Sequence, residues 1–185
     1  MEVEQTSVAD VLLIRPRIWG DQRGFFVETW QRDRYAAAGI SLPFVQDNHS
    51  RSRGGTLRGL HFQRSHPQGK LVYVSLGSVF DVAVDIRPDS PTFGKWFGAV
   101  LTADNQHQLW VPPGMAHGFL VLSETAHFHY KCTDFYHPED EGSLRWDDPD
   151  IGIIWPDSPE ILLSDKDRVA PCWRDVRDAL LRDRA

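Results

Sequence analysis

The sequence predicts an all-β protein, a single-domain β-sandwich or jelly roll spanning residues 1–185. Short runs of β-branched and aromatic residues alternate with Gly, Pro, Asn and Asp, which is typical of strands joined by tight turns. Turn signals recur at short spacing, for example at Leu76–Ser78, Arg87–Pro91 and Val111–Gly114, as in antiparallel sheets. Helical periodicity is scarce, and no repeat or low-complexity linker divides the chain.

The predicted strands follow one another along most of the chain. They are Val11–Ile14, Phe25–Glu28, Thr56–Gln63, Lys70–Leu76, Val79–Ile86, Phe97–Leu101, His107–Val111, Gly118–Leu122 and His127–Thr133. In Val79–Ile86 one face carries only apolar side chains, Phe80, Val82, Val84 and Ile86, and is predicted to lie in the core. Two helices are expected, Trp30–Ala38, which Gly39 ends, and Trp173–Leu181.

Composition and charge exclude several classes of protein. Hydrophobic content of 41% and charged content of 25% are ordinary for a globular protein. The net charge of −6 argues against non-specific nucleic-acid binding. No apolar run reaches the length of a membrane span, and the N-terminus lacks signal-peptide features. Cys132 and Cys172 form no CxxC pair, so a reduced, cytoplasmic setting is expected.

One segment of this acidic protein is electropositive. Residues Asn48–Phe80 contain no Asp or Glu, but they carry Arg51, Arg53, Arg58, Arg64, Lys70, His49, His61 and His66. Cations offset the desolvation of a phosphate or carboxylate, so this segment is predicted to hold an anion. Strand alternation puts His61 and Gln63 on one face, and nearby cations favour a neutral imidazole that can act as a base. The pattern indicates an enzyme for an anionic substrate.

The string PPGMAHGF, which contains His117, resembles the second motif of the cupin jelly roll, where the histidine often binds a metal. The first cupin motif should then supply His-x-His followed by a glutamate. The chain instead has His61-Phe62-Gln63, and the next charged residue on a matching strand is Lys70. Because a protonated lysine repels a divalent cation, we expect a cupin-type barrel without a catalytic metal.

Other candidate residues have ordinary alternatives. Tyr130 is either a functional phenol or a core tyrosine, and Asp167 in LSDKDR taken alone is a solvated loop charge. Arg23, Phe26 and Glu28 could grip a phosphate and a base, or they could belong to an edge strand with mixed surface residues.

From Val8 to Pro171 the chain resembles the dTDP-4-dehydrorhamnose 3,5-epimerase family. The resemblance rests on ordered strings, namely RGFFVE, FVQDNHS, LRGLHFQ, QGKLVYV, VFDVAVDIR, SPTFGKW, LWVPPGMAHGFLVLS, YKCTDFY and LSDKD. It implies a metal-free, cofactor-independent epimerase that converts dTDP-4-dehydro-6-deoxy-D-glucose to dTDP-4-dehydro-L-rhamnose.

The resemblance also implies catalytic roles. His61 would remove the protons from C3 and C5, and Asp167 would partner this histidine. Tyr130 would return a proton from the opposite face, and Lys70 would lie near the C4 oxygen. Such a division suits the chemistry, because inversion needs a base and a separate acid, and a fixed ammonium stabilises an enolate.

Binding roles follow from the same resemblance. Arg23 and Arg58 would hold the diphosphate, and Gln63 and His117 would line the pocket. The deoxythymidine and its surroundings would be contacted by Phe26, Glu28, Gln46, Asn48 and Tyr136. The family enzyme is a homodimer, so the RGFFVE strand would complete the partner's site.

Three alternatives stay open at this point. Some relatives epimerise only C3 or only C5 with the same histidine and tyrosine. A non-enzymatic sugar-nucleotide binding protein is expected to have lost His61, Tyr130 or Lys70, and none is lost here. A metal-dependent dioxygenase would require bound metal, against which Lys70 and Gln63 weigh.

Overall fold

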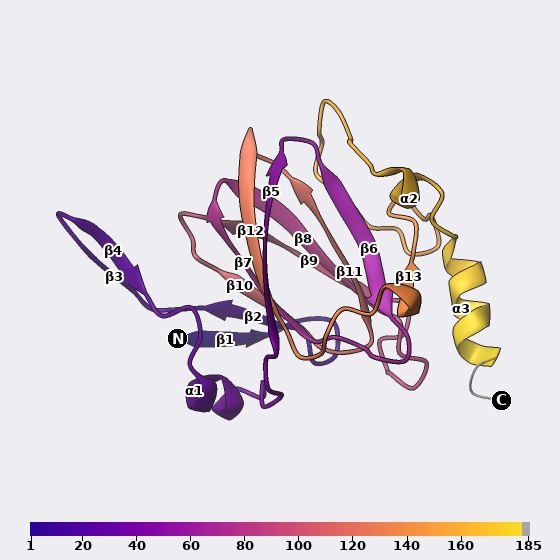
Figure 1. The fold of residues 1–185 in the computed structure, drawn as a ribbon, viewed down its shortest axis with the longest axis horizontal. Coiled ribbons are helices and arrows are strands. Elements are labelled where there is room, and N and C mark those ends of the chain that lie inside the picture. The colour runs from indigo at the N-terminus through magenta and orange to yellow at the C-terminus, as the bar shows by residue number, and fades with distance from the viewer. Residues whose placement is uncertain (183–185) are drawn as a thin grey trace.

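Two antiparallel β-sheets form the body of the protein in a computed structural model that describes residues 1–182 (Figure 1). The six-stranded sheet has the order β1 (Glu2–Gln5), β2 (Leu12–Arg15), β10 (Gln108–Val111), β7 (Lys70–Leu76), β12 (Thr125–Cys132) and β5 (Gln46–Arg53). The five-stranded sheet has the order β13 (Glu141–Ser143), β6 (Leu57–Gln63), β11 (Met115–Val121), β8 (Ser78–Asp85) and β9 (Trp96–Thr102). This architecture confirms the predicted all-β, cupin-type jelly-roll class.

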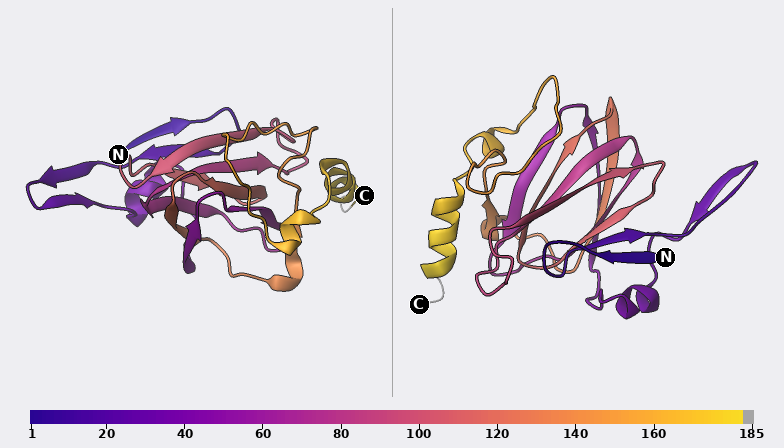
Figure 2. Two further views of the ribbon diagram at one scale, coloured as in Figure 1. Left: turned by 90° about the horizontal axis from the view of Figure 1, so that it is seen from above. Right: turned by 180° about the vertical axis from the view of Figure 1, so that it is seen from behind.

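The remaining elements lie at the edges of the sandwich. The hairpin of β3 (Ile18–Asp21) and β4 (Gly24–Val27) projects at the end opposite to α3 (Trp173–Arg182), as Figures 1 and 2 both show. Two further helices are α1 (Arg32–Ala37) and α2 (Asp165–Arg168), and η1 (Pro138–Asp140) is a single 3₁₀ turn. Among residues 1–182, no helix has the length and apolar character needed to cross a membrane.

Every predicted strand overlaps an observed strand, and both predicted helices form. Gly39 directly follows the C-cap of α1 with φ +97°, the left-handed conformation expected of a helix-ending glycine. The sequence reading missed β1, β3, β5 and β13, and it also missed the short helix α2.

The core has three parts. Between the sheets lie side chains from both layers, including Val72 and Phe128 from one sheet and Ala83 and Phe119 from the other. The outer face of the five-stranded sheet packs on the C-terminal segment through Phe80, Val82, Val84, Leu144, Trp173 and Val176. The outer face of the six-stranded sheet is covered near α1 by Tyr35, Ile40 and Trp110.

Strand β8 shows why the sandwich can hold polar groups inside. Its apolar face is buried, as predicted, but it packs on the C-terminal segment rather than on the other sheet. The opposite face is buried as well and carries Asp81 and Asp85, both 0% exposed. Asp85 accepts hydrogen bonds from Arg87, Ser90 and Thr92. The buried carboxylates of β8 are tolerated because each one has hydrogen-bonding partners.

Candidate active site

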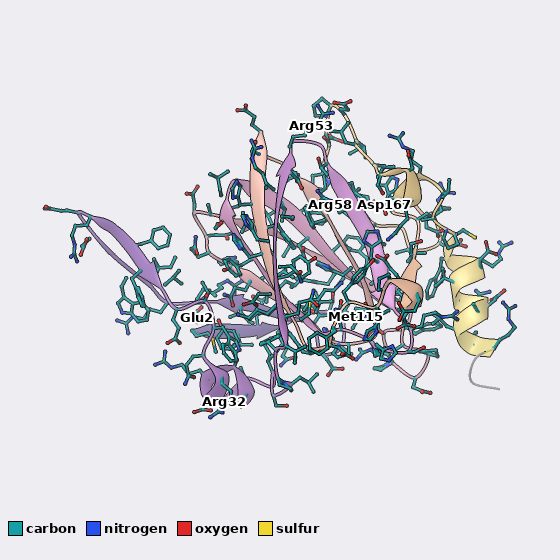
Figure 3. The ribbon with its side chains drawn as sticks, in the orientation of Figure 1. Glu2, Arg32, Arg53, Arg58, Met115 and Asp167 are labelled. Atoms are coloured by element: carbon teal, nitrogen blue, oxygen red, sulfur yellow. The ribbon has the colours of Figure 1, made fainter. Side chains whose placement is uncertain are left out.

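Two adjoining cavities lie in the sandwich and are lined by both sheets. The smaller has a volume of about 300 Å³ and is lined by Gln46, Asn48, His61, Phe62, Gln63, Gln68, Lys70, Tyr130, Tyr136 and Glu141. The larger has a volume of about 600 Å³ and includes Arg53, Arg58, His117, Lys166, Asp167 and Arg168. Arg53, Arg58 and Asp167 are labelled in Figure 3. His61, Lys70 and Tyr130 line both cavities, so they mark the place where the two meet.

His61 and Asp167 form a short dyad. His61 Nε2 lies 2.6 Å from Asp167 Oδ1, although 106 residues separate them in the chain. The backbone N–H of Asp167 donates to Ser164 Oγ at 3.1 Å, which caps helix α2 and holds the carboxylate against β6. Asp167 is therefore the hydrogen-bonding partner of His61. Its side chain is buried, so the interpretation of Asp167 as a solvated loop charge is wrong.

The surroundings of Asp167 favour the ionised form of its carboxyl group. Burial raises the pKa of Asp167, but hydrogen bonds from His61, Ser164 and the backbone of Gly59 more than offset this effect and hold the pKa below its usual value. A buried anion at this distance stabilises the imidazolium form of His61 when the histidine takes up a proton.

Lys70 and Tyr130 come from neighbouring strands of the six-stranded sheet. Lys70 opens β7 and is the cross-strand partner of Cys132, two residues after Tyr130 on β12. Burial lowers the pKa of Lys70 and raises the pKa of Tyr130. The Tyr130 phenol therefore stays protonated at neutral pH and can donate its proton. The Lys70 ammonium loses its proton more readily than a lysine in water does.

These groups stand on opposing walls. His61 belongs to β6 of the five-stranded sheet, whereas Lys70 and Tyr130 belong to the six-stranded sheet that faces it. A planar group held between the walls would meet a base on one face and an acid on the other. The arrangement can thus remove a proton from one face of a carbon and deliver a proton to the opposite face.

A bulge in β6 brings Arg58 to the same cavity as His61. Residues three apart on a regular strand point to opposite faces. In the pairing of β6 with β11, Arg58 lies opposite Phe119 and His61 lies opposite His117. Between these two pairs β6 advances by three residues and β11 by only two. The extra residue is accommodated at Gly59, which has φ +113°, and a Cβ there would lie 2.6 Å from the His117 oxygen.

His117 also lies in the cavity, where a buried carboxylate binds it. His117 Nε2 is 3.0 Å from both carboxylate oxygens of Asp81 on the adjacent strand β8. Within residues 1–182 no group of three or more His, Cys, Asp or Glu side chains could hold a metal ion. The hydrogen bonding to Asp81 holds the His117 ring in the cavity wall.

The smaller cavity carries the predicted amides and Tyr136. Gln46 Nε2 donates to Asn48 Oδ1 at 3.0 Å, and Gln46 Oε1 accepts from the Tyr136 backbone N–H at 3.1 Å. Gln63 has its amide engaged by backbone groups, since Nε2 donates to the Phe135 carbonyl and Oε1 accepts from His137 N–H. Gln63 therefore holds the loop that carries Tyr136.

Three predicted binding residues lie outside both cavities of this chain. Arg23 is exposed at the tip of the β3–β4 hairpin and pairs with Asp21. Phe26 is 66% exposed, and Glu28 is 2.7 Å from Arg34. The structure does not bring these residues to the dyad within one subunit.

An ion pair that the sequence analysis did not predict lies between two residues that line the cavities. Lys166 Nζ and Glu141 Oε1 form an ion pair of 2.6 Å that links α2 to β13. Glu141 also accepts a hydrogen bond of 3.0 Å from the Tyr136 hydroxyl. Lys166 lies in the string LSDKD and could have been noticed there, whereas nothing in the local sequence marks Glu141.

Comparison with known proteins assigns the family. The family model described as dTDP-4-dehydrorhamnose 3,5-epimerase matches residues 5–175. The enzyme of that name from Pseudomonas aeruginosa is 53% identical over 177 residues, which cover 95% of this chain and 98% of the relative. The Neisseria gonorrhoeae enzyme is 50% identical over 98% of this chain, which spans only 56% of that longer relative.

A solved structure agrees over nearly the full length. It is the crystal structure of dTDP-6-deoxy-D-glucose-3,5-epimerase from Legionella pneumophila in complex with dTDP-4-keto-L-rhamnose. Its TM-score is 0.94 at 50% sequence identity, with 97% of this chain and 96% of that chain covered. On these matches, the chain belongs to the dTDP-4-dehydrorhamnose 3,5-epimerase family.

Proposed function

We propose that the protein epimerises dTDP-4-dehydro-6-deoxy-D-glucose at C3 and C5 and yields dTDP-4-dehydro-L-rhamnose, on the way to dTDP-L-rhamnose. Family membership supports the substrate class. The observation that carries the proposal is the placement of His61 and Tyr130 on facing sheets around one cavity. Inversion of a carbon requires that geometry, because removal and delivery of the proton occur on opposite faces.

His61 is the proposed base. Its imidazole takes the proton from C3, and the electron pair of the C–H bond moves toward the C4 carbonyl to form an enolate. Asp167, at 2.6 Å, orients the ring and stabilises the imidazolium. The histidine then returns its proton to solvent before the same step occurs at C5.

Lys70 and Tyr130 are proposed to complete the reaction. Lys70 stabilises the negative charge that develops on the C4 oxygen, which is the largest electrostatic demand of the reaction. Tyr130 donates its phenolic proton to the carbon from the face opposite His61 and is reprotonated afterwards. All four groups belong to the protein, so the proposed mechanism uses neither a metal nor a cofactor.

The proposed nucleotide contacts follow the chemistry of the cavities. Gln46, Asn48 and Tyr136 surround the deoxythymidine in the smaller cavity with amide and aromatic groups. Arg58 supplies positive charge to the diphosphate, and His117 with Gln63 shapes the pocket.

A homodimer is proposed to supply the contacts that one subunit lacks. The β3–β4 hairpin extends away from the sandwich and exposes Phe25 and Phe26, which are 58% and 66% exposed (Figure 1). Docked on a second copy, the hairpin would bring Arg23, Phe26 and Glu28 to the partner's nucleotide. A cytoplasmic, single-domain dimer is the form of the enzyme that we propose.

Deuterium uptake tests the function. The enzyme is incubated with dTDP-4-dehydro-6-deoxy-D-glucose in D₂O without added metal or nicotinamide, and the sugar is followed by NMR. Deuterium at both C3 and C5 with L-configured product is the expected result. Uptake at one carbon would assign a mono-epimerase, and no uptake would exclude the proposed reaction.

A further inference from the structure

Strand β5 presents a row of polar side chains to the interior. Its residues alternate between exposed positions on the outer face and shielded positions on the inner face. The inner positions are Gln46, Asn48, Ser50 and Ser52. Gln46 and Asn48 line the smaller cavity, and Ser50 lines the larger one. One edge strand therefore follows the substrate space from one cavity to the other.

The hydroxyl of Ser50 differs from its neighbours in the row. Gln46 donates to Asn48 at 3.0 Å, and Ser52 Oγ accepts from Arg58 Nε at 3.1 Å. Ser50 Oγ is buried, and it is the one buried side-chain polar atom that has no hydrogen-bond partner within residues 1–182. Proteins rarely leave a buried hydroxyl unpaired, because such a group has lost its hydrogen bonds to water without replacement.

The position of Ser50 suggests what supplies the missing partner. Ser50 is the cross-strand partner of Phe128, and Tyr130 lies two residues further along the same side of β12. Arg58 lines the same cavity, and its hydrogen bond to Ser52 uses Nε alone, so the Nη groups of the guanidinium have no partner among the described residues. A donor hydroxyl and a free guanidinium edge beside Tyr130 form a site for an oxygen atom.

We propose that Ser50 is a substrate-binding residue whose hydroxyl donates a hydrogen bond to a substrate oxygen held beside Arg58. The inference rests on the proposed function, which puts the substrate in these cavities, and it adds a contact that no sequence motif predicts. The oxygen belongs either to the diphosphate or to a hydroxyl of the sugar ring.

The variant Ser50→Ala tests the inference by two independent readings. Removal of an unpaired hydroxyl leaves every protein hydrogen bond intact, so the Tm should stay unchanged or rise. The dissociation constant of dTDP-glucose, measured by calorimetry, should increase up to about tenfold if the partner is a sugar hydroxyl, and about ten- to a hundredfold if it is a diphosphate oxygen. The control is Ser75→Ala, a serine on the exposed face of β7 that bonds His129 outside both cavities.

The same titration with dTDP identifies the oxygen. If Ser50→Ala weakens dTDP and dTDP-glucose by the same factor, the partner is a diphosphate oxygen, and if it weakens dTDP-glucose alone, the partner is a sugar hydroxyl. Unchanged affinity for both ligands, or a Tm that falls below that of Ser75→Ala, would overturn the inference. Deuterium uptake by the wild-type enzyme is measured separately, so failure of the proposed reaction would be recognised independently of Ser50.

Discussion

The His61–Asp167 dyad makes the strongest quantitative prediction, through the substitution Asp167→Asn. The side chain keeps its size but loses its charge, so the imidazolium formed during proton abstraction loses its counter-ion. With Nε2 and Oδ1 at 2.6 Å, the two charge centres lie about 4 Å apart, and at an effective dielectric constant of about 20 their attraction is about 4 kcal/mol. Since about 1.4 kcal/mol corresponds to a factor of ten in rate, deuterium uptake should slow about 10³-fold.

The assay is the initial rate of deuterium incorporation at C3 and C5, followed by NMR at saturating substrate. Asp165→Asn is the matched control, because Asp165 lies in the same helical turn, is fully exposed, and loses the same charge on substitution. The control should retain the wild-type rate within about twofold, since exposed charges interact weakly. A rate for Asp167→Asn within tenfold of wild type, or an equal loss in both variants, would refute the role assigned to the dyad.

The same pair predicts how stability depends on pH. Because the pKa of Asp167 is lower in the folded protein than its ordinary value of 3.8, the folded state binds this proton more weakly than the unfolded chain. The stabilisation is therefore present above pH 3.8 and is lost as the pH falls through the folded-state value. The difference in Tm between wild type and Asp167→Asn should therefore shrink as the pH falls below 3.8.

Three further substitutions test other parts of the site. Tyr130→Phe should still exchange protons at His61 but should form inverted product at least about 10²-fold more slowly; inversion at the wild-type rate, seen by NMR, would remove Tyr130 as the acid. Lys70→Met should abolish exchange and raise the Tm at pH 7, because burial lowers the pKa of Lys70. The wild type should recover this deficit as the pH rises toward 10.5, where the unfolded chain also loses the proton, and a pH-independent difference would contradict the assignment. Gly59→Ala should cost about 1–3 kcal/mol of unfolding free energy in a denaturant titration, because its φ is +113° and its Cβ would strike the His117 backbone.

Much of the fold could be predicted because most strands carry their own local signal. Alternating β-branched residues and turn dipeptides mark segments such as Lys70–Leu76, whose predicted bounds are those of β7. Strand β5, Gln46–Arg53, has no such signal, since all of its side chains are polar. It is a strand because its backbone pairs with β12 along its whole length, and this long-range pairing cannot be predicted from the segment itself.

The candidate site was predicted unevenly for a related reason. His61 and Lys70 lie in a segment whose charge stands out from the rest of the chain. Glu141 comes from a three-residue strand with no local pattern, and it reaches the site by pairing with Lys166. The roles given to Arg23, Phe26 and Glu28 require a second subunit, so neither the sequence pattern nor the geometry of one subunit tests them.

By itself, the sequence determined the chemistry of this protein: which bases, acids and cations it carries, the order of the motifs that assign its family, and the strand periodicity that yields an all-β fold. Only the tertiary structure decided that Asp167 meets His61 across 106 residues and that His61 and Tyr130 face each other from different sheets. The physical reason is the distance along the chain over which each interaction acts. Side-chain periodicity reflects interactions between residues close in the sequence. The contact between distant segments depends on how two complete sheets pack, which no single segment encodes.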